Sequence, residues 1–209
     1  MKLTTMLVAA MVAATTGALA AGVPAAGKVL VCISSDNHGL TPGFVMVLTR
    51  AEDITSRMFK SAGVAVEWRH AGSGACRKPQ QTQTIMLDFA TNTPASQHPG
   101  TLAYALPYEG VHIVVMVDRI RKGRAGPVQV SAILAHVMTH EITHILQGAA
   151  RHSETGVMKA HWDSQDFFQM TKGPLPFAPE DIDLIERGIR LRAAGATSAA
   201  PSAATAELN

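Results

Sequence analysis

A long apolar segment between Pro127 and Gly148 limits the folds open to this chain more than any other part of its sequence. Pro127 suits the first turn of a helix and Gly148 suits the position after its last turn, so we predict one helix between them. Apolar residues occupy nearly every side of this helix: Ile133, Leu134, Val137, Met138, Ile142 and Ile145. A helix of that kind is expected to be buried, and the fold must therefore enclose it.

The polar residues of this segment form one stripe. They follow the three- and four-residue steps that place side chains on the same face of a helix: His136, His140, Thr143, His144 and Gln147. A buried polar stripe needs partners other than bulk water, and a metal ion at the floor of a cleft would satisfy it. His136 lies one turn before the other two histidines, and we expect it to line the cleft rather than to bind the ion.

The stripe contains the motif His-Glu-x-x-His, formed by His140, Glu141 and His144. The two histidines lie one turn apart, so both imidazoles can reach one zinc ion at about 2.0–2.1 Å. Glu141 is offset by one residue and faces the open side of the ion, where it can act as a general base without being a ligand. The competing interpretation is an ordinary pair of core histidines, which the same spacing allows.

A catalytic zinc site usually has a third protein ligand and leaves a fourth position for water. The nearest candidate is His152, because the chain can turn back toward the ion after Gly148. The alternatives are acidic residues further along the chain: Glu154, Asp163, Asp166 and Glu180.

The run His140–Met158 resembles the metzincin metallopeptidases, and the matrixins among them. The resemblance implies three zinc ligands, His140, His144 and His152, and a methionine turn at Met158 beneath the metal. It extends more weakly to Leu102–Pro107, which is similar to the edge strand that binds substrate in that family. Asp181–Ile185 is similar to the family's C-terminal helix.

The spacing of the third histidine departs from the family pattern His-Glu-x-x-His-x-x-Gly-x-x-His. Gly148 stands one residue late in this chain and His152 two residues late. A longer last helical turn and a wider loop would absorb these residues.

The rest of the sequence predicts a mixed α/β (α+β) fold of the metzincin-like zincin type. We expect a twisted sheet of about five strands, an N-terminal helix, the buried helix and a C-terminal helix. The strands are expected over residues 28–34, 64–68, 84–89, 101–106 and 111–118, and the two outer helices over 42–62 and 179–192. The fourth and fifth strands, separated by Pro107 and Gly110, are expected to be antiparallel neighbours.

The two ends of the chain lie outside this catalytic domain, which we place at residues 21–192. Residues 1–20 combine one charge, Lys2, with a short apolar run and the small-x-small site Ala18-Leu19-Ala20. This pattern is typical of a signal peptide, so we expect a periplasmic or secreted protein without a membrane span after cleavage; an uncleaved anchor is the alternative. Residues 193–209 contain almost no core-forming residues, and we predict a disordered tail.

Export bears on the cysteines, because an oxidising compartment allows Cys32 and Cys76 to form a disulfide. On the chain-entropy model such a link stabilises the fold by roughly 4 kcal/mol. Two free thiols are the alternative interpretation.

The charge balance excludes one class of partner. Lys and Arg number 18 against 16 Asp and Glu, and no strong basic stripe is visible, so nucleic acid is not expected to bind. The short basic run over residues 119–124 is expected to be a solvated loop.

Together these features predict an exported zinc-dependent endopeptidase acting on peptides or proteins through a zinc-bound water, with Glu141 as general base. Substrate would pair with the edge strand at Leu102, Ala103 and Tyr104. Candidates for stabilising the oxyanion are Tyr104, Tyr108 and His161. The alternatives are a zincin of another clan with an acidic third ligand, and an exported metal-binding protein without catalysis. The sequence does not indicate an oligomeric state.

Overall fold

The computed structural model describes residues 27–34, 41–70, 76, 84–106, 110–123, 126–194 and, for the backbone alone, 206–208. Residues 1–20, for which we predict a signal peptide, lie outside these ranges. Within them, no helix combines the length and the apolar character that a membrane crossing requires.

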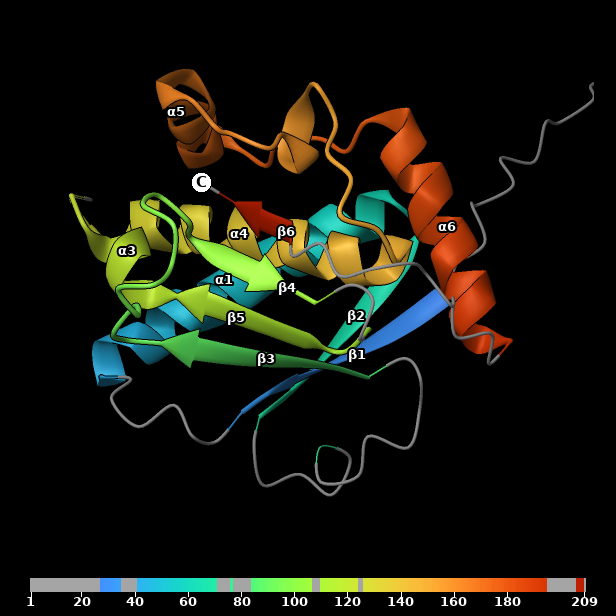
Figure 1. The fold of residues 1–209 in the computed structure, drawn as a ribbon, viewed down its shortest axis with the longest axis horizontal. Coiled ribbons are helices and arrows are strands. Elements are labelled where there is room, and N and C mark those ends of the chain that lie inside the picture. Colours follow the sequence, from blue (N-terminus) through green and yellow to red (C-terminus); the bar gives the residue numbers. More distant parts are fainter. Residues whose placement is uncertain are drawn as a thin grey trace, which may run out of the picture.

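One mixed sheet runs through the molecule (Figure 1). Its strands are β1 Gly27–Ile33, β2 Val64–His70, β3 Thr84–Ala90, β4 Ala103–Ala105, β5 His112–Met116 and β6 Ala206–Leu208, in the order β2-β1-β3-β5-β4-β6. The first three strands and β5 are parallel to one another, whereas β4 is antiparallel to β5. The mixed α/β fold is as predicted: β1 to β5 are the five expected strands, and β6 adds a sixth at the edge. The antiparallel pairing of β4 with β5 is also as predicted.

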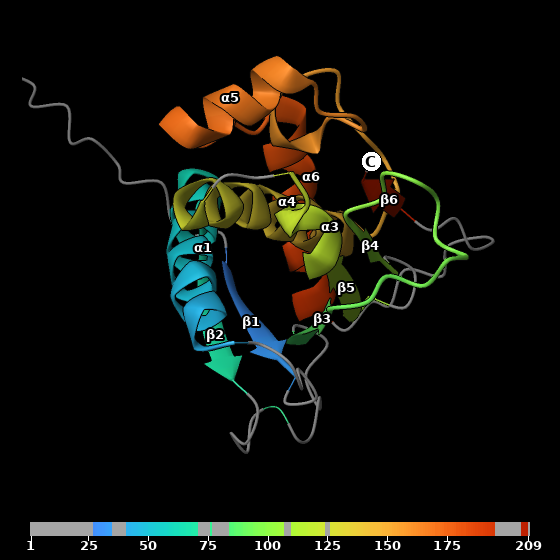
Figure 2. The same ribbon diagram turned by 90° about the vertical axis from the view of Figure 1, so that its left-hand side faces the viewer.

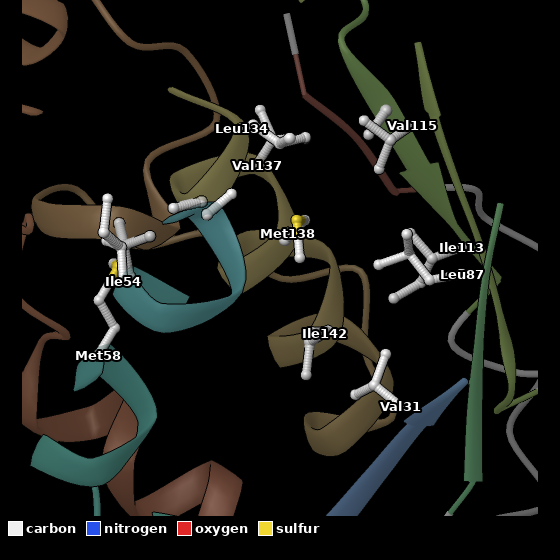
Figure 3. Packing of buried hydrophobic residues seen from close by; sticks show 14 of the residues in the cluster. Val31, Ile54, Met58, Leu87, Ile113, Val115, Leu134, Val137, Met138 and Ile142 are labelled. Carbon is white, nitrogen blue, oxygen red and sulfur yellow. The ribbon is translucent and has the colours of Figure 1, made fainter. Parts of the chain in front are cut away.

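Helix α4, Pro127–Gln147, is the centre of the fold, and every residue from Val130 to Leu146 is buried. It packs against α1, Pro42–Ser61, on one side and against sheet residues such as Val31, Leu87, Ile113 and Val115 on another (Figure 3). The strands beneath it carry buried apolar runs, as expected of parallel strands covered by helices. The buried central helix predicted from the sequence is therefore present.

Three shorter helical segments and one longer helix complete the described chain. They are α3 Val117–Arg121, the 3₁₀ turn η1 Gly156–Met158, α5 Ser164–Lys172 and α6 Pro179–Ala193. Helices α5 and α6 both contact α4 (Figure 2). Helix α6 approaches α4 closely because Gly188 has no side chain; a Cβ there would lie 1.7 Å from the Leu146 carbonyl oxygen.

Three segments differ from the sequence-based expectation. The fifth strand ends at Met116, and its expected last residues begin α3 instead. Part of the basic run belongs to this helix, where Arg119 donates hydrogen bonds to the carbonyl oxygens of Gln97, His98 and Thr101 and so ties down the preceding loop. The tail for which we predicted disorder contributes the three residues of β6.

Cys32 and Cys76 form a disulfide in the structure, with their Cα atoms 5.7 Å apart. The bond links buried strand β1 to Cys76, which stands in the segment between β2 and β3. It therefore attaches Cys76, which lies between β2 and β3 in the sequence, to the strand that lies between those two in the sheet.

Replacing Gly188 by Ala tests the close approach of α6 to α4. The added Cβ would overlap backbone atoms of Leu146, so we expect the free energy of unfolding to fall by roughly 1–3 kcal/mol. Urea unfolding measures this loss. Gly43→Ala is the matched control, because a Cβ at that position of α1 meets no atom within 4 Å; an equal loss in both variants would contradict the packing argument.

Candidate metal centre

Helix α4 carries His140, Glu141 and His144 in the middle of the protein, and all three residues are fully buried. The two imidazoles face each other, with their Nε2 atoms 2.9 Å apart. The helix ends just beyond them, because Gly148 adopts the left-handed conformation with φ 64° and its N–H donates to the His144 carbonyl oxygen.

Backbone carbonyl groups orient both rings. His140 Nδ1 lies 2.8 Å from the Val157 oxygen, and His144 Nδ1 lies 3.0 Å from the Ala149 oxygen. A carbonyl oxygen only accepts, so both Nδ1 atoms donate and both Nε2 atoms of the neutral rings present lone pairs. Two lone pairs turned toward each other at this distance favour a cation between them.

The chain brings His152 to the same place. Its ring centroid lies 5.2 Å from that of His140 and 4.9 Å from that of His144. One ligand atom from each of the three histidines lies within 4.8 Å of the others. His152 Nε2 is buried and has no hydrogen-bond partner among the described residues, as expected of an atom meant for a metal. The three side chains therefore fit a metal ion.

Burial keeps these histidines neutral near pH 7. Desolvation is the main reason why the pKa of His144 is lowered to about 4 and why the pKa of His140 is lowered well below its ordinary value. The pKa of His152 is also lowered, again mainly by burial. Neutral imidazole is the form that binds a metal, so the group is ready to coordinate at neutral pH.

A carboxylate from α6 holds the loop that carries His152. Asp181 Oδ1 accepts hydrogen bonds from Arg151 Nη1 at 2.8 Å and from Ser153 Oγ at 2.7 Å, so both neighbours of His152 are anchored. Asp181 Oδ2 accepts a third from the Ala178 N–H at 3.1 Å. The longer spacing between His144 and His152 is thus compatible with one site, because Asp181 holds the end of the loop that carries His152.

The turn that contains Met158 packs against α4, the helix of His140 and His144. Met158 is buried in η1, its carbonyl oxygen accepts from the Ser153 N–H, and the preceding residue, Val157, supplies the oxygen that orients His140. Gly156 begins this turn with φ 76°, and a Cβ on it would lie 2.2 Å from the Pro176 oxygen. The turn therefore supports His140 and, through Ser153, the loop that carries His152.

The acidic alternatives for a third ligand lie elsewhere. Glu180 is exposed and pairs with Arg151, while Asp163 and Asp166 cap α5 and pair with Lys159. Glu154 is exposed. Among the described residues, the group of three or more His, Cys, Asp or Glu side chains that lie close enough to share an ion consists of these three histidines.

His136 has a different role, because both of its ring nitrogens are used. Its Nδ1 lies 2.7 Å from the Ala132 carbonyl oxygen, and its Nε2 accepts from the Leu175 N–H at 2.9 Å. Burial lowers the pKa of His136 to about 4. The side chain ties the segment before α6 to α4 and is not placed to bind the metal.

The predicted edge strand lies beside the centre. Leu102 and Ala103 are buried, Tyr104 is half-buried, and β4 contacts α4. A pocket of about 620 Å³ opens next to Leu102 and is also lined by Arg119, Trp162 and Phe167. The Trp162 ring centroid lies 5.7 Å from that of His140, so this residue forms a wall shared by the pocket and the metal centre. Of the predicted oxyanion candidates, His161 is exposed and Tyr108 lies outside the described residues.

No model of a known protein family matches the chain, and no curated protein matches its sequence. The fold is similar to that of a zinc-dependent peptidase from Methanocorpusculum labreanum, with a TM-score of 0.52 over 75% of this chain and 99% of that one. The two sequences are 12% identical, so the likeness concerns the fold.

Acid should destabilise the metal-free protein through His136. Its pKa is about 4 when folded and ordinary, near 6.5, when unfolded, so below pH 6.5 the unfolded chain binds a proton that the folded chain does not. The stability it contributes is present above pH 6.5 and is lost toward pH 4, by up to roughly 3 kcal/mol. His136→Gln keeps an acceptor for the Leu175 N–H, and urea unfolding should show a shallower acid loss. An unchanged loss would assign the titration to other groups.

Removing the anchor of the loop should weaken metal binding without touching a ligand. In Asp181→Ala, Arg151 and Ser153 lose their shared acceptor, so we expect the dissociation constant for Zn²⁺ to rise on the order of tenfold. Competition with a chromogenic chelator measures this constant. Asp183→Ala is the control, because it removes the same charge from an exposed position of the same helix; equal effects would point to net charge instead.

Proposed function

We propose that this chain is an exported zinc-dependent endopeptidase that hydrolyses peptide bonds at the centre formed by His140, His144 and His152. The observation that carries the proposal is the convergence of three buried imidazoles, one of them with an Nε2 that has no partner among the described residues. Three histidine ligands with an open fourth position are typical of catalytic zinc. A structural zinc would need a fourth protein ligand, and the described residues gather only three in this group.

We assign the centre to the metzincin type. In support of this, the third histidine comes from the loop after the helix, and Met158 lies buried in a turn that packs against α4. The hydrogen bond from His140 to Val157 in that turn explains why a tight turn is needed there. The fold likeness to a zinc-dependent peptidase agrees with this assignment but extends to the fold alone.

Glu141 is the proposed general base. When bound, zinc polarises the scissile carbonyl and makes a water molecule more acidic. Glu141 removes a proton from the attacking water as its oxygen bonds to the carbonyl carbon, then delivers that proton to the amide nitrogen as the C–N bond breaks. Glu141 stands between His140 and His144 in the sequence but is offset from their face of α4, which supports a carboxyl group beside the ion rather than bound to it.

Substrate is proposed to lie extended along β4, hydrogen-bonded to its backbone as an added strand. Short side chains at Ala103 and Ala105 leave this strand close to α4, which carries the metal ligands. One substrate side chain would enter the pocket at Leu102, where Trp162 separates it from His140. Export is supported by the signal-peptide pattern and by the Cys32–Cys76 disulfide, which an oxidising compartment favours.

Glu141→Gln separates catalysis from metal binding. Gln has nearly the same shape and cannot take the proton, so we expect at least a hundredfold fall in kcat for a quenched fluorescent peptide, in line with roughly 10²–10⁴-fold for general base catalysis. Zinc content, measured by atomic absorption on the same sample, should stay at the wild-type level. Wild-type turnover in this variant would overturn the role given to Glu141.

The ligand set is tested by replacing each of two histidines in turn by alanine and measuring the zinc content and turnover of both variants. His152→Ala should lose zinc and turnover together, whereas His161→Ala, which removes an exposed ring, should keep its zinc. Retention of zinc by His152→Ala would move the third ligand to another residue.

A further inference from the structure

The free edge of β4 is occupied by the end of the chain itself. Strand β6 pairs antiparallel with β4, in the register Ala103↔Leu208, Tyr104↔Glu207 and Ala105↔Ala206. The other edge of β4 pairs with β5. Figures 1 and 2 both show β6 beyond β4, at the end of the sheet order.

This edge is the one that an extended substrate would need. A peptide can add to β4 only on the side away from β5, and β6 takes the hydrogen-bonding positions of that side. Strand β6 also contacts α4, the helix of the metal ligands. The tail therefore occupies the edge of β4, beside α4, that the proposed function assigns to substrate, and this edge is the substrate groove of that proposal.

Strand β6 runs antiparallel to β4 and pairs along the whole length of that strand. Its C-terminal residue, Leu208, is paired with Ala103, next to the Leu102 that lines the pocket. The last residue of β6 is thus paired one residue away from a residue that lines the pocket.

We propose that β6, residues 206–208, is a tethered occupant of the substrate groove that competes with substrate. This inference rests on the proposed function, because that proposal is what makes the groove a substrate site. The pairing of the tail with β4 is independent of it.

The short pairing makes the occupant reversible. A three-residue strand binds weakly alone, but residues 195–205 tether it to α6 and can span up to about 40 Å. Because β6 and α6 belong to one chain, the pairing is intramolecular, and a segment tethered in this way has an effective concentration on the order of 1 mM. If the free segment binds with a dissociation constant of about 0.1 mM, the tail reduces access to the groove about tenfold.

Truncation after Ala194 gives the first test. Helix α6 ends at Ala193, so the variant keeps every helix of the described chain. We expect kcat/KM for a quenched fluorescent peptide to rise on the order of tenfold, mainly through a lower KM, as the tethered competitor is removed. Equal kcat/KM in the two forms would overturn the proposal while leaving the peptidase assignment intact.

A binding measurement separates the two proposals, because it requires no turnover. A fluorescein-labelled peptide with the sequence of residues 201–209 should bind the truncated, zinc-free protein in an anisotropy titration and bind the full chain about tenfold more weakly. If neither form cleaves any peptide but this difference is found, the tail pairing stands and the peptidase assignment falls. Equal binding to both forms would overturn the tail proposal.

Proline substitutions in the full chain supply a matched pair. Successive N–H groups of a strand point to opposite sides, so either that of Glu207 or those of Ala206 and Leu208 face β4. We compare the single variant Glu207→Pro with the double variant that combines Ala206→Pro and Leu208→Pro. In the anisotropy titration, one of them should bind the peptide as tightly as the truncated protein does, and the other as weakly as the wild type. If both variants bind the peptide as weakly as wild type, β6 is not held by backbone pairing and the proposal fails.

Discussion

The burial of α4 is the constraint on which the rest of the structure depends. A helix with a polar stripe and no exposed side needs partners for its side chains from the chain around it. The later half of the sequence supplies them: the carbonyl oxygens of Ala149 and Val157 for His144 and His140, and the N–H of Leu175 for His136. These hydrogen bonds constrain the path of the chain after Gly148, because the segments that contain Ala149, Val157 and Leu175 each return to the polar stripe, at successive turns of the helix.

The same constraint explains how a longer loop serves one metal site. The number of residues between His144 and His152 limits the distance between the two side chains, but it does not determine where His152 lies. Its place is set from outside the loop by Asp181, which anchors the residues on either side of it. A buried carboxylate with an Arg partner and two further donors is stable only if all are present together, so the ligand loop and the start of α6 form one unit.

Much of the central helix and of its histidine pair is predictable, because the sequence features that indicate them lie close together in the chain. The apolar run of α4, its flanking Pro127 and Gly148 and the spacing of His140 and His144 all act within a few turns of one helix, and sequence periodicity reports such features well. The role of Asp181 was missed because its partners lie about thirty residues earlier in the chain; its one sequence signal, an acidic residue in the first turn of a helix, has a sufficient local explanation. Helix α5 was missed because its exposed residues give a weak apolar pattern, although the Asp163 and Asp166 capping box marks its start. No local pattern predicts β6, since its partner is a strand a hundred residues away.

Hydrogen bonds within the protein, rather than the metal, pre-organise the centre. The rings of His140 and His144 are fixed by carbonyl groups that need no ion, and the loop of His152 is fixed by a carboxylate that is not a ligand. The cost of bringing neutral imidazoles with facing lone pairs together is therefore met by folding, before any ion binds. An ion that binds the folded chain alone then stabilises it by mass action, and the ion gains affinity because little ordering remains to be done. Stability and metal binding are thus coupled through the same few hydrogen bonds, which is why these backbone acceptors belong to the site as much as the ligands do.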